Sequence, residues 1–170
     1  LAGPLSPWLQ QQTTAMLASS IPSSTAYRLP ALLADIRLLD MLELTGATVH
    51  ASAFLNITQP TVSRRYRALA SDFGLLRQLR QRKRARYGHS EAIHCLRQGA
   101  RAHRLEAGYV RLGASLFHRH LLTHLPQLLP MPGQVRPVEE WAELVRLAVI
   151  DGALLSSLEL TAHHREHTLT

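Results

Sequence analysis

Residues 45–74 read TGATVHASAFLNITQPTVSRRYRALASDFG, and this stretch decides the fold. Its first part predicts a short helix with Ala51, Phe54 and Leu55 facing the interior. The sequence Asn-Ile-Thr at residues 56–58 then interrupts the helical pattern. The stretch therefore predicts two short helices that are joined by a tight turn.

The second helix of this pair has clear start and stop signals. Thr58 is a residue type that caps helix starts, and Pro60 suits the first turn, where its missing N–H costs no hydrogen bond. Gly74 is typical of the residue that ends a helix. Apolar residues at helical spacing form the predicted buried face: Val62, Tyr66 and Leu69.

A helix pair of this kind, with polar and arginine side chains outward on the second helix, is typical of proteins that read DNA. The first helix would brace the second, which lays its N-terminal turn in the major groove. Glutamine can bond an adenine edge and arginine a guanine edge, while further arginines hold phosphates. The residues predicted to contact DNA are Thr58, Gln59, Pro60, Thr61, Ser63, Arg64, Arg65 and Arg67, followed by Arg80, Arg82, Lys83, Arg84 and Arg86.

The positive charge of the chain is concentrated in one segment. The 170 residues carry a formal charge of +7. Residues 64–111 hold thirteen cations and three acids, which amounts to +10, whereas the remainder amounts to −3. Such a segment favours a polyanionic partner, and a solvated basic surface is the alternative.

The segment after Gly74 predicts two further elements. Residues 75–88 have no helical stripe and many cations, which indicates a two-stranded wing or an extended loop. Residues 90–116 predict one long helix with a coiled-coil-like seam, which favours a homodimer; an ordinary core helix is the alternative. The predicted dimer seam consists of Ile93, Leu96, Ala100, His103, Ala107 and Val110.

The flanking regions predict less regular structure. Residues 1–30 are rich in Pro, Ser, Thr and Gln and predict a flexible lead-in. A helical stripe begins at Ala31 and consists of Leu32, Ile36, Leu39 and Leu42. Residues 138–149 predict another helix, with Trp141, Leu144, Val145 and Ala148 inward, and residues 150–155 predict a buried strand.

At residues 45–74 the chain resembles the winged helix-turn-helix of LysR-type transcriptional regulators. The shared landmarks run without a gap: Thr45, Gly46, Ala51, Leu55, Thr58, Gln59, Pro60, Val62, Ser63, Arg64, Leu69, Phe73 and Gly74. Residues 138–157 are similar to the first helix and following strand of that family's effector domain. The segment after Gly74 departs from the family's wing motifs, because it has Leu-Arg-Gln at 76–78 and Tyr-Gly-His at 87–89.

The resemblance implies a mainly α fold, in which a winged helix-turn-helix is followed by a long linker helix and a small α/β portion. The expected parts are a flexible segment (1–30), the DNA-binding domain (31–89), the linker and dimerisation helix (90–116) and a partial effector-like segment (117–170). The family's ligand cleft lies between two subdomains, which the last segment is too short to build. We therefore expect a fragment or a shortened regulator that binds no small-molecule effector.

Other chemistries have weaker support. The chain has ten histidines, including two groups that could suggest a metal site: His118, His120 and His124, and His163, His164 and His167. They lack the acid of an HExxH arrangement, so we expect no metal and no cofactor. A recombinase or transposase module would need an acidic triad that we do not find, and no catalytic constellation is evident. These two classes, a recombinase-like recognition module and a histidine-rich metal-binding protein, are the alternatives.

The sequence also bears on compartment and partners. Cys95 is the only cysteine, which excludes a disulfide within this chain, and residues 1–20 contain no Lys or Arg of a secretory leader. We expect a cytoplasmic protein that is not an enzyme, binds double-stranded DNA as a homodimer and does not enter a membrane.

Overall fold

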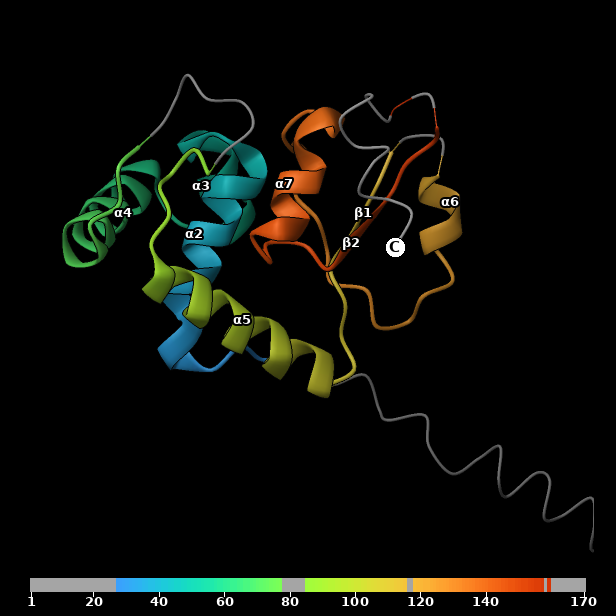
Figure 1. The fold of residues 1–170 in the computed structure, drawn as a ribbon, viewed down its shortest axis with the longest axis horizontal. Helices are drawn as coiled ribbons and strands as arrows, with labels where there is room; N and C mark the ends of the chain where they lie inside the picture. The colour runs from blue at the N-terminus through green and yellow to red at the C-terminus, as the bar shows by residue number, and fades with distance from the viewer. Residues whose placement is uncertain (1–26, 78–84, 116–117, 158, 160–170) are drawn as a thin grey trace, which may run out of the picture.

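The structure, a computed structural model, describes residues 27–77, 85–115, 118–157 and 159. It is mainly helical, as expected, with one small sheet (Figure 1). The elements in chain order are η1 (Ala31–Leu33), α2 (Ala34–Thr45), α3 (Thr48–Leu55), α4 (Gln59–Phe73), α5 (Glu91–Glu106), β1 (Leu112–Ala114), α6 (Arg119–Leu122), η2 (Val138–Glu140), α7 (Trp141–Arg146) and β2 (Gly152–Leu154).

Helix α2 is the centre of the molecule, and every residue from 38 to 45 is buried. It ends at Gly46, whose φ of +68° is a left-handed conformation that glycine adopts without strain. Of the predicted stripe, Ile36 is buried, but Leu32 is 89% exposed. The prediction for Leu32 is wrong because residues 31–33 form η1 outside the α-helix.

The helix pair at residues 45–74 forms where the sequence predicts it. Between α3 and α4, Asn56 takes a left-handed conformation with φ of +53°, and the Ile57 N–H donates to the Ser52 carbonyl oxygen at 3.1 Å. Helix α4 starts after Thr58 and ends at Gly74. Its predicted inner residues are buried, and they pack in the common core: Val62, Tyr66 and Leu69.

Most of the predicted wing lies outside the described residues, which omit 78–84. The described parts, residues 75–77 and 85–88, contain no strand. They are nevertheless attached to α4, because the Tyr66 hydroxyl donates to the Tyr87 carbonyl oxygen at 3.0 Å and the two rings meet edge to face.

Helix α5 ends ten residues before the predicted end at residue 116. It starts as expected, since the Ser90 hydroxyl accepts a hydrogen bond from the Ile93 N–H. It ends at Glu106, where Gly108 turns the chain with φ of +81°. Leu112–Ala114, which the predicted helix included, form β1 instead.

The predicted dimer seam on this helix is wrong for at least two residues. Ile93 and Ala100 are buried in the core of their own chain, so they cannot also contact a second copy. The His103 Nδ1 and the Tyr27 hydroxyl oxygen are 3.1 Å apart and form a hydrogen bond within the same chain. Val110 lies beyond the helix, where it pairs with Leu128. The seam is therefore not a continuous surface of one helix.

The C-terminal half is built on two parallel strands, β1 and β2, in which Leu112 pairs with Gly152 and Ala114 with Leu154. Helix α7 lies between the sheet and the helices α2 and α3 (Figure 1). The predicted helix at 138–149 is shorter than expected, because α7 ends at Arg146 and Ala148 takes a φ of +58°. The predicted strand at 150–155 forms over the three residues of β2, but it is only partly buried, and Leu154 is exposed.

Within the described ranges, no helix has both the length and the hydrophobicity that crossing a membrane requires.

Candidate nucleic-acid interface

Helix α4 lies at the edge of the molecule farthest from the sheet, with one face free (Figure 1). Among the side chains predicted to contact DNA, Thr58, Gln59, Pro60, Arg64 and Arg67 are exposed, and Thr61, Ser63 and Arg65 are partly exposed. All eight are thus accessible on one helix and the residue that precedes it.

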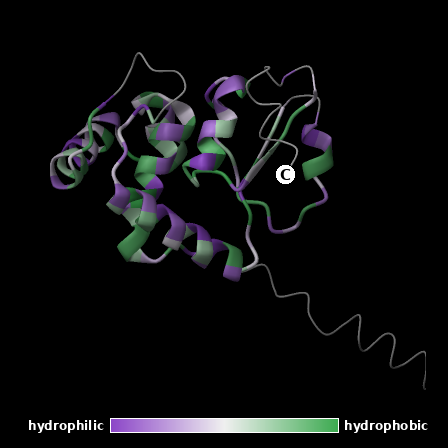
Figure 2. Cartoon of the chain, in the orientation of Figure 1, coloured by the Kyte–Doolittle hydropathy of each residue, from purple (hydrophilic) through white to green (hydrophobic). Residues whose placement is uncertain are grey.

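The opposite face of α4 is anchored. Val62, Tyr66 and Leu69 are buried, and the Tyr66 hydroxyl bond to Tyr87 fixes the middle of the helix to the chain that follows it. In Figure 2, hydrophilic and hydrophobic residues alternate around α4, as an amphipathic surface helix requires. Rotation of the helix would expose its apolar face, so its outward side is well defined.

The first turn of α4 is held by side-chain hydrogen bonds. The Gln59 Nε2 donates to the Thr48 Oγ1 at 3.0 Å, which links the starts of α4 and α3. The Thr58 and Thr61 hydroxyls are 2.8 Å apart. Thr58 occupies the N-cap position that we predicted, although its side chain makes no capping bond to the backbone. The Gln59 amide keeps its Oε1 and the second Nε2 hydrogen free, which are the two groups that a bidentate contact to adenine uses.

The three arginines of α4 differ in their partners. Arg64 has no hydrogen-bond or ion-pair partner among the described residues, and the Arg67 Nε donates only to the Ser63 carbonyl oxygen at 3.3 Å. Arg65 forms an ion pair with Asp35 of α2, and both side chains are well exposed. Arg64 and Arg67 are therefore free to bind an anion, whereas Asp35 partly neutralises Arg65.

Arg86 does not lie at the predicted interface. Its guanidinium Nη2 donates to both carboxylate oxygens of Glu140, at 2.7 and 2.9 Å, and its backbone N–H donates to Glu43 at 2.9 Å. A DNA contact from Arg86 therefore stays a prediction, and it would compete with the buried carboxylate of Glu140. Its neighbours in that prediction, Arg80, Arg82, Lys83 and Arg84, lie outside the described residues.

Arg86 belongs to a buried charge cluster beneath α2. Arg136, which is fully buried, donates to Glu43 at 3.2 Å and to Glu140 at 2.5 Å. Glu43 also accepts the Tyr87 backbone N–H at 2.8 Å. Burial raises the pKa of Glu43, an effect opposed by the charges of Arg97 and Arg136 and by its backbone hydrogen bonds.

A second buried cluster surrounds Asp40, one turn earlier on α2. The Arg97 Nε donates to Asp40 at 3.0 Å, and the Arg111 Nη1 donates to the other Asp40 oxygen at 3.3 Å. Burial raises the pKa of Asp40, and the positive charges of Arg97 and Arg111 oppose it. Burial correspondingly lowers the pKa of Arg111.

A third cluster joins α5 to the sheet through Asp151. Arg104 donates to both oxygens of Asp151, at 3.1 and 2.6 Å, and the Arg111 backbone N–H donates at 2.7 Å. The Arg101 Nε lies 3.3 Å from the same carboxylate. Asp151 thus fixes the end of α5 against β1.

These clusters neutralise much of the positive charge of residues 64–111. Six of its arginines are paired with acids from outside residues 64–111: Arg65 with Asp35 at the surface, and Arg86, Arg97, Arg101, Arg104 and Arg111 in the three clusters. The local charge of +10 is therefore not a surface charge of the same size. The signal that could have revealed this is the pair Asp40 and Glu43, which stand in an otherwise apolar stretch of α2.

The histidine groups do not assemble into a metal site in the described part of the chain, where no cluster of three or more His, Cys, Asp or Glu side chains could hold a metal ion. His118 instead shares a hydrogen bond with the Ser115 hydroxyl at 2.9 Å. His163, His164 and His167 lie outside the described residues.

No protein-family model, no curated protein and no solved structure matches this chain. The resemblance to LysR-type regulators therefore stays a prediction from residues 45–74 and 138–157.

Proposed function

We propose that this chain is a sequence-specific DNA-binding transcription regulator of LysR type, in which α3, residues 56–58 and α4 act as a helix-turn-helix. The observation that carries the proposal is the combination on α4 of an anchored apolar face and an accessible polar face that includes Arg64 and Arg67. The family landmarks at residues 45–74 fall on these same elements.

The chemistry of the accessible face suits a DNA groove. Gln59 and Arg64, on the first turns of α4, are the residues to read base edges, with Thr61 beside them for a thymine methyl group. Arg67 lies one turn after Ser63 and is placed to hold a phosphate. Arg65 adds a second phosphate contact when it leaves Asp35.

A homodimer on an inverted repeat remains part of the proposal, since paired helices of this type bind half-sites one DNA turn apart. The contact between copies would lie away from Ile93 and Ala100, which the core of each chain occupies. We place the protein in the cytoplasm, where DNA is available and its exposed Cys95 stays reduced.

Selection of binding sites from a random duplex pool, at one stated salt concentration, tests the proposal. The unmodified chain should enrich a defined sequence, and Arg64→Ala should relax the preference at particular base positions. Arg146→Ala is the matched control, because Arg146 is an exposed arginine of α7, a helix that α2 and α3 separate from α4 (Figure 1). If no sequence is enriched, or if both variants change the motif equally, α4 is not the reading helix.

A further inference from the structure

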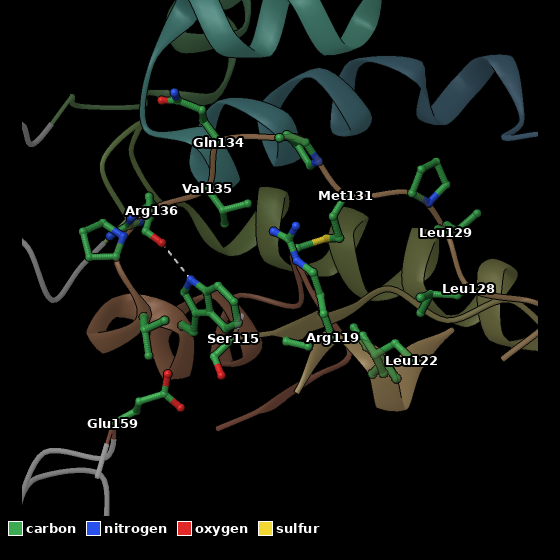
Figure 3. Close-up of a pocket in the computed structure, with 18 of the residues that line it drawn as sticks. Ser115, Arg119, Leu122, Leu128, Leu129, Met131, Gln134, Val135, Arg136 and Glu159 are labelled. Carbon is green, nitrogen blue, oxygen red and sulfur yellow. Dashed lines mark hydrogen bonds between the residues drawn. The ribbon is translucent and has the colours of Figure 1, made fainter. Parts of the chain in front are cut away.

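The C-terminal half contains a cavity of about 860 Å³. It is open to solvent on one side and is bounded by β1, α6, residues 128–138 and the first turn of α7 (Figure 3). Its size is within the range of pockets that hold small organic molecules. Two of the elements that bound it, β1 and α6, lie on the side of the molecule away from α4 (Figure 1).

The cavity wall is mostly apolar and partly fixed. The larger apolar side chains that line it include Leu112, Leu122, Leu128, Met131, Val135 and Trp141. The Trp141 indole N–H donates to the Arg136 carbonyl oxygen at 2.7 Å, which holds the ring in place. The ring also lies against Gly113, where an added Cβ would be 2.8 Å from its Cζ3 atom.

One cation points into this apolar space. The Arg119 side chain extends from α6 into the cavity toward the side on which Met131 lies (Figure 3). Arg119 has no ion-pair or hydrogen-bond partner among the described residues, and it is exposed. An anion that entered the cavity would therefore find an unoccupied guanidinium.

The one carboxylate at the cavity has partners of its own. Glu159 accepts hydrogen bonds from the Ser156 backbone N–H at 2.7 Å and from its hydroxyl at 2.9 Å. It lies at the lower left of Figure 3, and the Arg119 side chain, near the centre, extends away from it toward Met131. The other charged residue in the wall, Arg136, directs its side chain to Glu43 and Glu140.

We propose that this cavity binds a small apolar carboxylate, with the hydrocarbon part against Trp141, Leu122 and Met131 and the carboxylate on Arg119. The proposal goes beyond DNA binding and does not depend on it. It also departs from what the family resemblance implies, because this cavity is formed by one unit of the chain and needs no second subdomain.

Trp141 provides a local readout. In a Trp8→Phe background Trp141 is the only tryptophan, so its fluorescence reports on the cavity alone. We would titrate this protein with octanoate, with 1-octanol, which keeps the chain but lacks the charge, and with acetate, which keeps the charge but lacks the chain. Octanoate should give a saturable change at the lowest concentration, 1-octanol a weaker one and acetate none.

Two arginine variants then test the charge. Arg119→Met, which keeps an unbranched apolar stem, should weaken octanoate binding about tenfold, as expected for loss of one charge-assisted contact, and leave 1-octanol unchanged. Arg146→Met, outside the cavity, should alter neither. The proposal is overturned by the absence of a saturable change, by equal binding of octanoate and 1-octanol, or by equal losses in the two variants. None of these results bears on DNA binding by α4.

Discussion

The arginines of α4 and those beneath α2 are the same residue type in two different situations. Arg64 and Arg67 stand on an exposed face without acidic partners in the described structure, whereas Arg97 and Arg136 are buried against Asp40 and Glu43. The difference arises from α2, whose buried acids Asp40 and Glu43 pair with Arg97 and Arg136, whereas no acid of α2 pairs with Arg64 or Arg67. The number of arginines in a segment therefore does not predict a DNA-binding surface. The acids that pair with each arginine must also be known.

The largest difference should appear in stability. Asp40→Ala leaves Arg97 and Arg111 buried without their carboxylate, and we expect the free energy of unfolding to fall by about 3–5 kcal/mol. Asp35→Ala, on the same helix, removes an exposed ion pair with Arg65 and should cost less than about 1 kcal/mol. Denaturant unfolding of the two variants measures both values. If both variants lost less than about 1 kcal/mol of unfolding free energy, Asp40 would not be a buried partner of Arg97 and Arg111.

Sequence discrimination should show the next largest effect. Gln59→Ala removes an amide from the first turn of α4, and we expect the preference for the selected site over random DNA to fall by about 1–3 kcal/mol. Competition binding against random duplex gives this value. Gln98→Ala, an exposed glutamine of α5, is the control and should leave the preference unchanged. An unaltered preference in Gln59→Ala would contradict the assignment of α4.

The salt dependence of DNA affinity should distinguish the unpaired arginines of α4 from the arginines that are paired with acids. Arg67→Met should reduce the slope of log affinity against log salt by about one, equally for all sequences, because one phosphate contact is lost. Arg101→Met removes an arginine that is partly exposed but paired with Asp151, and the slope should stay the same. A reduced slope in Arg101→Met would show that the buried group also contacts DNA.

The smallest expected effect concerns Arg65. Asp35→Asn removes the partner that partly neutralises this arginine, so affinity for any duplex should rise about twofold to threefold at low salt and less at high salt. Binding measured at two salt concentrations checks this. Weaker binding instead would mean that Asp35 holds Arg65 in the orientation that DNA requires.

The parts of the fold that the sequence predicts are those with local signals. Asn56, Pro60 and Gly74 mark the ends of α3 and α4 because each acts on its own backbone or the next turn. The end of α5 was placed too late, since the apolar residues of 109–116 fit a helical stripe and a strand equally well. Gly108 is the local residue that decides between them.

The buried charge clusters could not be predicted in the same way. Asp40 meets an arginine 57 positions later, and Glu43 meets one 93 positions later. Pairings of this kind depend on how whole elements pack, and no spacing rule within one helix indicates them. The accessible face of α4 was predictable because its period follows from one helix, while the pairing of Arg86 with Glu140 was not.

The most direct test follows backbone amide signals of the isotope-labelled protein by NMR while a selected duplex is added. The account predicts that the largest shifts occur at residues 58–67, on the first turns of α4, and that Asp40, Arg97 and Arg136 change little. Shifts centred on α5 or on the sheet, with the start of α4 unaffected, would contradict it.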